Sequence, residues 1–298
     1  WDVFSTYKKI GGAPLNVALR LNSFNDNVTM ISCVGDDANG KALLVYAEKE
    51  GLDNSHIQIN KEFKTSEVIV SLDNTGSASY KIEFPCAWDY IVINDPILDS
   101  VKSADAFIFG SLIARNNISY NTLLELLDGA LFKVFDVNLR SPHYTIGILK
   151  ELMERADFIK FNDDELFEIS RNLGFNSDDL QKNIEFISKK TNTDTICVTR
   201  GGNGAILYID ETFYNNTGYK VLVADTVGAG DSFLASLIHK LLKRETPQNA
   251  IDFACAAGAL VASNIGAYPK ISNKAIFELI KGSGWNLHFK RLGRFSNH

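Results

Sequence analysis

The segment Asp225-Thr-Val-Gly-Ala-Gly-Asp231 places two glycines between two carboxylates, directly before a stretch with helical periodicity. Apolar residues at positions 233, 234, 237, 238, 241 and 242 have the spacing of an amphipathic helix. Because Gly228 and Gly230 have no side chains, backbone N–H groups there could approach an anion at the positive end of the helix dipole. The segment therefore predicts a phosphate-binding turn, with Asp231 in or next to the first helical turn. The alternative is that Asp231 only caps the helix and the glycines only form a tight connection, and the motif alone does not decide between the two.

A second glycine pair, Gly11-Gly12, precedes Ala-Pro-Leu-Asn16 and another helix-like stretch. Two glycines allow a ligand to approach the backbone, and the Asn16 amide can donate and accept hydrogen bonds. By itself the pair is more typical of a turn. A third segment, Thr199-Arg-Gly-Gly-Asn-Gly204, lies between two apolar runs. It either forms a hairpin or lines an adenine pocket, and the hairpin is the simpler interpretation.

The segment from Gly35 to Ala42 matches a Walker A phosphate-binding loop except at its last position. Ala42 stands where that motif has the hydroxyl that binds Mg²⁺, and Asp36 and Asp37 would repel phosphate groups. We therefore reject a P-loop.

Short apolar runs alternate with helix-like stretches between about residues 104 and 262. Four runs rich in β-branched or aromatic residues are Ala106–Gly110, Phe132–Asp136, Asp157–Phe161 and Thr195–Thr199. Near-continuous apolar strands between helices predict an α/β fold whose mainly parallel sheet is covered on both faces. In such sheets ligands bind at the carboxyl ends of the strands, and polar residues end these runs at 110–111, 136–140 and 162–165.

Residues 64–90 have a different pattern. Ser66–Leu72 and Ala78–Phe84 alternate polar and apolar residues on either side of Asp73-Asn-Thr-Gly76, which is typical of an antiparallel hairpin. We expect this hairpin to project from the α/β body as a lid.

The chain of 298 residues has 45% hydrophobic residues, 22% charged residues and a formal charge of -6, which is typical of a globular protein and excludes collagen, coiled coil and disorder. Its longest apolar run, Phe253–Ala262, is too short to span a bilayer and predicts a buried helix. The acidic balance argues against nucleic acid or an anionic membrane as a partner, but not against a nucleotide. Four scattered cysteines indicate neither a zinc site nor disulfides, so we expect a cytoplasmic protein. Because the chain begins with Trp1, we expect a few native residues to precede it.

Taken together and in this order, these segments resemble the PfkB, or ribokinase-like, family of sugar and nucleoside kinases, from Trp1 to about Pro269. Gly11–Ala18 is similar to the family's first signature and Asp225–Phe233 to its second. The segments that lie in the expected order between them are Cys33–Gly40, Asp136–Arg140 and Asn162–Glu165. Within the family the chain is most similar to the bacterial fructokinases, through the segments Trp1–Phe4, Ala87–Ile91 and Phe109–Leu112.

The resemblance implies a ribokinase-like three-layer α/β/α sandwich with a mainly parallel central sheet and a small β lid. Residues 1–282 would form a single kinase domain, with the lid formed mainly by 64–90. Residues 283–298 would be a tail that is disordered or foreign to the native protein. In many relatives the lid also pairs two subunits, so we expect a homodimer through the lid. Asn25 stands where the family has glycine after its first helix, and asparagine is the next best residue for a left-handed helix cap.

The resemblance also assigns roles to individual residues. Asp231 matches the catalytic base that takes the proton from the sugar hydroxyl, and the matching anion hole consists of Gly228, Ala229 and Gly230. The matching sugar-binding positions are Asp2, Gly12, Asn16 and Arg140. The matching nucleotide-binding positions are Asn162, Thr199, Gly202, Gly204, Gly228 and Gly230. Asn162 and Glu165 match the N-x-x-E motif of the Mg²⁺ environment, where contact with the ion is through water. The family's potassium-binding loops are resembled by Asp225–Val227 and Ala262–Gly266.

The activity that the resemblance implies is that of a carbohydrate kinase, which uses ATP, Mg²⁺ and a potassium ion. The expected reaction transfers the γ-phosphate of ATP to the primary hydroxyl of a ketohexose, with fructose 6-phosphate as the product from fructose. Ribokinase, 2-keto-3-deoxygluconate kinase and nucleoside kinase remain alternatives within the family. A non-catalytic sensor of sugar or nucleotide on the same fold is an alternative outside it, against which Asp231 and both signatures argue. We expect a small-molecule sugar and ATP as partners, with no nucleic acid and no membrane.

Overall fold

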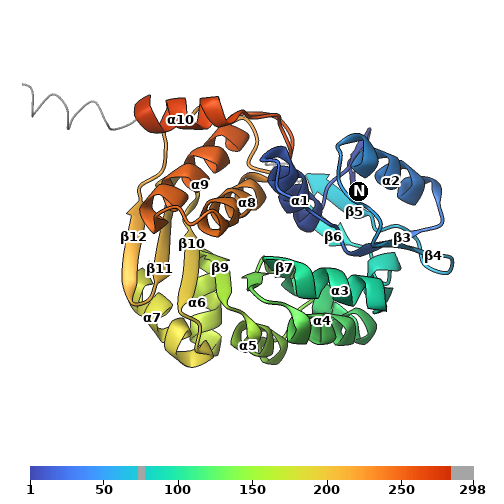
Figure 1. Ribbon diagram of the computed structural model, residues 1–298, viewed down its shortest axis with the longest axis horizontal. Coiled ribbons are helices and arrows are strands. Elements are labelled where there is room, and N and C mark those ends of the chain that lie inside the picture. Colours follow the sequence, from blue (N-terminus) through green and yellow to red (C-terminus); the bar gives the residue numbers. More distant parts are fainter. Residues whose placement is uncertain (73–77, 283–298) are drawn as a thin grey trace, which may run out of the picture. The chain divides into compact units, whose positions relative to one another are not determined.

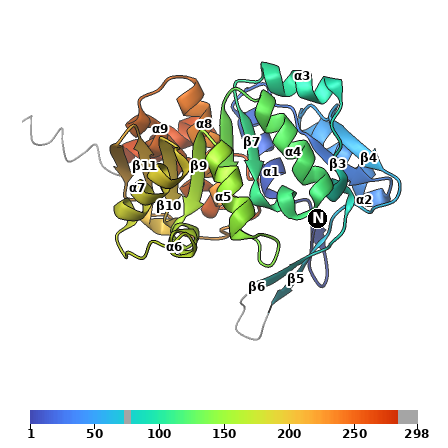
Figure 2. The same cartoon turned by 90° about the horizontal axis from the view of Figure 1, so that it is seen from below.

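A computed structural model describes residues 1–72 and 78–282 (Figures 1 and 2). The chain divides into two compact units, the first from Trp1 to Phe158 and the second from Ile159 onward. The predicted turn at 73–76 and the predicted tail at 283–298 lie outside the described residues. Within the described part of the chain, no helix combines the length and the apolar character needed to cross a membrane.

The described part of the first unit contains strands β1 to β8 and helices α1 to α5, most of which are labelled in Figure 1. Its strands are β1 (Asp2–Val3), β2 (Lys8–Lys9), β3 (Ser32–Gly35), β4 (Ile57–Asn60), β5 (Val68–Leu72), β6 (Ala78–Ile82), β7 (Phe107–Gly110) and β8 (Lys133–Asp136). Its α-helices are α1 (Ala13–Ser23), α2 (Ala38–Lys49), α3 (Asp95–Ser103), α4 (Asn117–Gly129) and α5 (Ile146–Arg155). Two short 3₁₀ helices are η1 (Ala87–Tyr90) and η2 (Ser111–Arg115).

The predicted hairpin is confirmed, because β5 and β6 pair antiparallel with Val68 opposite Ile82 and Leu72 opposite Ala78. The sheet that contains it is larger than the sequence indicated. Its strand order is β2-β1-β5-β6, and β1 pairs with β5 in parallel, with Asp2 beside Val68. The first residues of the chain and the expected lid therefore share one sheet.

Besides β1 with β5, the parallel pairs among the described strands of the first unit are β3 with β4 and β7 with β8. Helices α3 and α4 pack together through Ile97, Val101, Leu126 and Ala130, a cluster in which each residue is buried. Helix α1 ends before Asn25, which has a φ of 64°. The expected left-handed conformation of Asn25 is confirmed.

The second unit contains β9 and the described elements that follow it. Strand β9 starts at Phe158, one residue before the boundary. Its strands are β9 (Phe158–Asn162), β10 (Thr195–Thr199), β11 (Ala205–Ile209) and β12 (Thr212–Asn216). Its helices are α6 (Asp163–Asn172), α7 (Leu180–Thr191), α8 (Ala229–Leu242), α9 (Pro247–Ala262), α10 (Asn273–Gly282) and the 3₁₀ helix η3 (Gly201–Asn203).

The sheet of the second unit has the order β12-β11-β10-β9, and both faces of β10 are covered. Ile196, Cys197 and Val198 have no exposed surface, although successive side chains of a strand point to opposite faces. Helices α6 and α7 pack against β10, and α9 packs against β11 and β12 (Figure 1). The predicted helix in 253–262 is confirmed as the buried second half of α9, which packs along α8.

Candidate active site

The first turn of α8 holds the residues of the Asp225–Asp231 segment that could bind an anion. Gly228 is the N-cap of this helix, and the Ser232 N–H donates to the Gly228 carbonyl at 2.9 Å. Asp231 lies in the first turn, as predicted, and is partly buried. The Ala229 N–H donates to the Thr226 carbonyl at 3.2 Å. The positive end of the helix dipole therefore lies beside the Asp231 carboxylate.

Gly228 is required at its position for two reasons. Its φ of 76° is in the left-handed region that residues with a side chain rarely adopt. A Cβ there would also lie 2.7 Å from the Cα of Ala267, in the segment after α9. The turn before α8 is therefore in direct backbone contact with the segment that follows α9.

Asp225 connects the same two segments. Its Oδ1 accepts from the Val227 N–H and its Oδ2 from the Gly266 N–H, both at 3.0 Å. The Ala262 carbonyl accepts from the Asp225 N–H at 3.2 Å. The structure thus brings together the two loops expected to bind potassium, with carboxylate and carbonyl oxygens, which are suitable ligands for a hard cation.

Asn162 and Glu165 form a capping box at the start of α6. The Asn162 side chain accepts from the Glu165 N–H at 2.8 Å, and the Glu165 carboxylate accepts from the Asn162 N–H at 2.9 Å. Each oxygen has two lone pairs, so these bonds leave the carboxylate able to accept from water. Residues 1–72 and 78–282 contain no group of three or more His, Cys, Asp and Glu side chains that could hold a metal ion.

The segment with the predicted nucleotide-binding residues Thr199, Gly202 and Gly204 forms the connection of an antiparallel hairpin between β10 and β11. The predicted hairpin is therefore confirmed, while its contact with adenine stays a prediction. Gly204 has a φ of 78°, and a Cβ there would lie 2.8 Å from the carbonyl carbon of Asn216. The Thr199 hydroxyl donates to the Phe161 carbonyl at 3.3 Å, which joins the ends of β10 and β9.

The predicted sugar-binding residues all belong to the first unit. Asn16 is buried in the first turns of α1, and its N–H donates at 3.0 Å to the carbonyl of Gly12, the N-cap, whose φ is 117°. Asp2 lies in β1 and is partly buried, whereas Arg140 lies beyond β8 and is exposed.

Charged groups surround Asp2. Burial raises the pKa of its carboxyl, while Lys9 and Arg140 act in the opposite direction. Asp2 and Arg140 are therefore close enough to interact, as a shared sugar site requires. Lys9, which lies opposite Asp2 in the register of β1 and β2, was not predicted from the sequence. Its position two residues before the Gly11-Gly12 pair was the available signal.

The segment that resembles a Walker A loop binds a carboxylate of the chain itself. Asp37 is the N-cap of α2, and its Oδ1 accepts from the Gly40 N–H at 2.8 Å. Its Oδ2 accepts from the Thr65 N–H at 2.8 Å. The anion-binding position of this loop is thereby filled, which agrees with the rejection of a P-loop.

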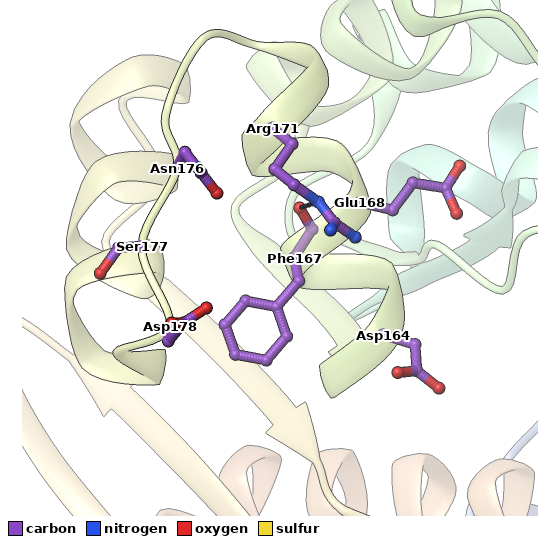
Figure 3. A pocket seen from close by; sticks show the side chains of 7 residues that line it. All are labelled: Asp164, Phe167, Glu168, Arg171, Asn176, Ser177 and Asp178. Carbon is purple, nitrogen blue, oxygen red and sulfur yellow. Dashed lines mark hydrogen bonds between the residues drawn. The ribbon is translucent and has the colours of Figure 1, made fainter.

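A pocket of about 380 Å³ lies beside α6 and contains none of the predicted site residues (Figure 3). The residues that line it are Asp164, Phe167, Glu168, Arg171, Asn176, Ser177 and Asp178. Three carboxylates line it against one guanidinium, whose Nε donates to the Phe167 carbonyl at 3.2 Å. A pocket with this excess of negative charge is unsuited to a nucleotide triphosphate.

Comparison with known proteins gives a family and several relatives. The model of the pfkB family of carbohydrate kinases matches residues 2–274. A sugar kinase of Pyrococcus horikoshii is 31% identical over 251 residues, which are 81% of this chain and 76% of the relative. The fructokinase of Salmonella typhimurium is 25% identical over 271 residues, 86% of this chain and 87% of the relative.

Solved structures show the same fold. The crystal structure of the Pyrococcus protein has a TM-score of 0.79 and 27% identity, and covers 94% of this chain and 96% of that one. A further structure of it is a complex with ATP. The fructokinase of Vibrio cholerae, with fructose, ADP and calcium bound, has a TM-score of 0.80 at 21% identity, and covers 94% of this chain and 95% of that one. These likenesses confirm the predicted α/β sandwich of the ribokinase-like type.

Proposed function

Because this chain belongs to the pfkB family of carbohydrate kinases, which matches residues 2–274, we propose that it transfers the γ-phosphate of ATP to the primary hydroxyl of a ketohexose. The proposed sugar is fructose, and the product is fructose 6-phosphate. The Salmonella relative named fructokinase and the Vibrio structure with fructose and ADP support this choice. The Pyrococcus structure with ATP supports ATP as the donor.

The observation that carries the proposal is the position of Asp231. Its carboxylate lies in the first turn of α8, three residues after the left-handed Gly228 and next to Gly230. We assign it as the base. In the transfer, the bond between the γ-phosphorus and the β-phosphate oxygen breaks, and its electron pair leaves with ADP. The sugar oxygen bonds to the phosphorus, and its hydroxyl proton passes to Asp231. The transition state is loose, so alignment and neutralised charge are the main requirements.

Backbone N–H groups at Gly228, Ala229 and Gly230 are proposed to bind the oxygens of the transferred group, because they lie at the positive end of the α8 dipole. Asn162 and Glu165 are proposed to hold Mg²⁺ through water. Such an ion usually keeps several waters and binds one or two carboxylates together with substrate phosphates, which fits a single buried Glu165. When bound, Mg²⁺ neutralises phosphate charge during the transfer.

Asp2, Gly12, Asn16 and Arg140 are proposed to bind the sugar. A carboxylate accepts from hydroxyls, a guanidinium donates to them, and the Asn16 amide does both. Sites built in this way reject analogues that would leave such groups unpaired. Thr199, Gly202 and Gly204 are proposed to lie along the nucleotide, and the loops joined by Asp225 to bind potassium.

A panel of sugars and nucleosides tests the proposal. ADP release is measured by a coupled assay with ATP and Mg²⁺ for fructose, ribose, 2-keto-3-deoxygluconate and adenosine. We expect fructose to give the highest kcat/KM. Turnover of adenosine without turnover of fructose would make the chain a nucleoside kinase, and tight sugar binding without turnover of any substrate would make it a sensor.

We further propose that the sheet β2-β1-β5-β6 acts as a lid and pairs two copies of the chain, and that the kinase acts in the cytoplasm. The four cysteines are all free and buried, which suits a reducing compartment. Sedimentation of the full chain would measure the oligomeric state.

A further inference from the structure

Lys160 is an unexpected residue for its position in β9. The strand also contains Phe158, Ile159 and Phe161, none of which has exposed surface, and Lys160 itself is only 7% exposed. Lysine is rarely buried, because an ammonium group loses its hydration there unless a specific environment compensates it. A lysine in the middle of such a strand therefore differs from every other buried residue of β9 in carrying an ionisable group.

The ammonium group of Lys160 lies beside the first turn of α8. A Cβ built on Gly230 would be 3.8 Å from the Nζ of Lys160. Because Gly230 has no side chain, it places no side-chain atom between this ammonium and the start of the helix. A full positive charge and the positive end of a helix dipole thus face the same space.

The alternation of the strand explains how the side chain reaches that space. Residues two apart in a strand point to the same face, so Lys160 lies on the face of Asn162. Asn162 ends β9 and caps α6 with its side chain. Lys160 lies two residues before Asn162 on that face. Its long, flexible side chain can reach the space beside the first turn of α8 from there.

We propose that Lys160 is a phosphate-binding residue of this kinase, whose ammonium contacts an oxygen of the phosphoryl group as it is transferred. The inference rests on the proposed function and adds a residue outside both glycine-containing signatures. Lys160 keeps its proton throughout, since the hydroxyl proton passes to Asp231. Its contribution is to stabilise the negative charge on the phosphoryl oxygens while the bond to ADP breaks.

Three variants of Lys160 test this role. Lys160→Met keeps an unbranched side chain one atom shorter and removes the charge, Lys160→Gln keeps a polar end without charge, and Lys160→Arg keeps the charge. We expect kcat to fall about 100-fold or more for the first two, as for the loss of one transition-state donor, with the sugar KM changed less than threefold. Lys160→Arg is expected to recover at least a tenth of the activity. Lys182→Met removes a lysine of α7 whose side chain is 66% exposed and should leave the kinetics unchanged.

Nucleotide binding gives a readout that does not depend on turnover. By calorimetry, Lys160→Met and Lys160→Gln should bind ATP at least about tenfold more weakly, while ADP affinity changes less than threefold, because only ATP has the transferred group. If the wild type turned over no substrate, the proposed function would fail, and these affinities would still decide the role of Lys160. Equal losses for ATP and ADP, or a kcat within threefold of wild type in either folded variant, would overturn the inference.

Discussion

Arg115 holds both carboxylate oxygens of Asp89, with its Nε 2.7 Å from Oδ1 and its Nη2 2.7 Å from Oδ2. The two side chains are 2% and 0% exposed, so the pair is almost completely buried. The same Nη2 donates to the Glu83 carbonyl at 2.7 Å, and the guanidinium carbon lies 3.9 Å from the centroid of the Trp88 ring. The pair therefore fixes the segment where the chain returns from β6.

Breaking this pair should destabilise the protein strongly. Arg115→Met leaves the Asp89 carboxylate buried without its partner, and we expect a loss of about 3–5 kcal/mol in the free energy of unfolding. Urea denaturation followed by circular dichroism measures it. The control is Arg155→Met, which breaks an ion pair with Asp128 in which the side chains are 35% and 74% exposed, and should cost about 1 kcal/mol or less. Similar losses for the two variants would refute the importance of burial.

The base assignment predicts the behaviour of Asp231→Asn. We expect kcat to fall about 10²- to 10⁴-fold with little change in ATP affinity, because the amide cannot take the hydroxyl proton but leaves the backbone N–H groups in place. Steady-state kinetics and calorimetry test the two parts. Asp95→Asn is the matched control, since Asp95 is also an aspartate in the first turn of a helix, α3, and lies on the surface. Wild-type turnover in Asp231→Asn would show that another group accepts the proton.

The proposed sugar site predicts a selective effect of Asp2→Ala. Loss of hydrogen bonds to a charged group should raise the sugar KM about 10- to 100-fold, while the ATP KM stays within threefold of wild type. Kinetics with each substrate varied in turn separates the two constants. An equal rise of both would indicate general damage to the fold, and Asp99→Ala on the surface of α3 serves as the control.

Asp37 predicts a dependence of stability on acid pH. Burial alone would raise the pKa of its carboxyl, but hydrogen bonds from Thr65 and Gly40 outweigh burial and lower it. A folded pKa below the unfolded one gives stability that is present above about pH 4 and is lost as the pH falls toward the folded pKa. The free energy of unfolding of wild type should therefore exceed that of Asp37→Asn at pH 6, and the difference should shrink as the pH falls below about 4. A difference that does not change with pH would contradict this account.

The sequence allowed the local features of the fold to be predicted, because each rests on neighbouring residues. The helix after Asp231, the hairpin of β5 and β6 and the left-handed Asn25 follow from periodicity, turn chemistry and capping. The same holds for the rejection of the P-loop, since Asp37 stands within the motif itself.

Contacts between distant parts of the sequence could not be predicted in this way. Asp89 and Arg115 are 26 residues apart, and nothing in either segment indicates that they pair. In the sequence Lys160 is one polar residue within an apolar run. The role proposed for it depends on its nearness to Gly230, which lies far along the chain. Strands β1 and β2 join the sheet of β5 and β6 through backbone pairing between residues more than 60 positions apart. A strand of two residues is too short for a periodic pattern that could predict this pairing.

The fit of Gly228 against Ala267 has a consequence for how this protein can change over evolutionary time. A Cβ on Gly228 would meet the backbone of Ala267, and backbone atoms are present whatever the side chain. This contact therefore does not depend on the side chain at position 267, but an insertion or deletion in the segment after α9 would displace the turn before α8. Engineers who wish to vary that segment should substitute residues and keep its length.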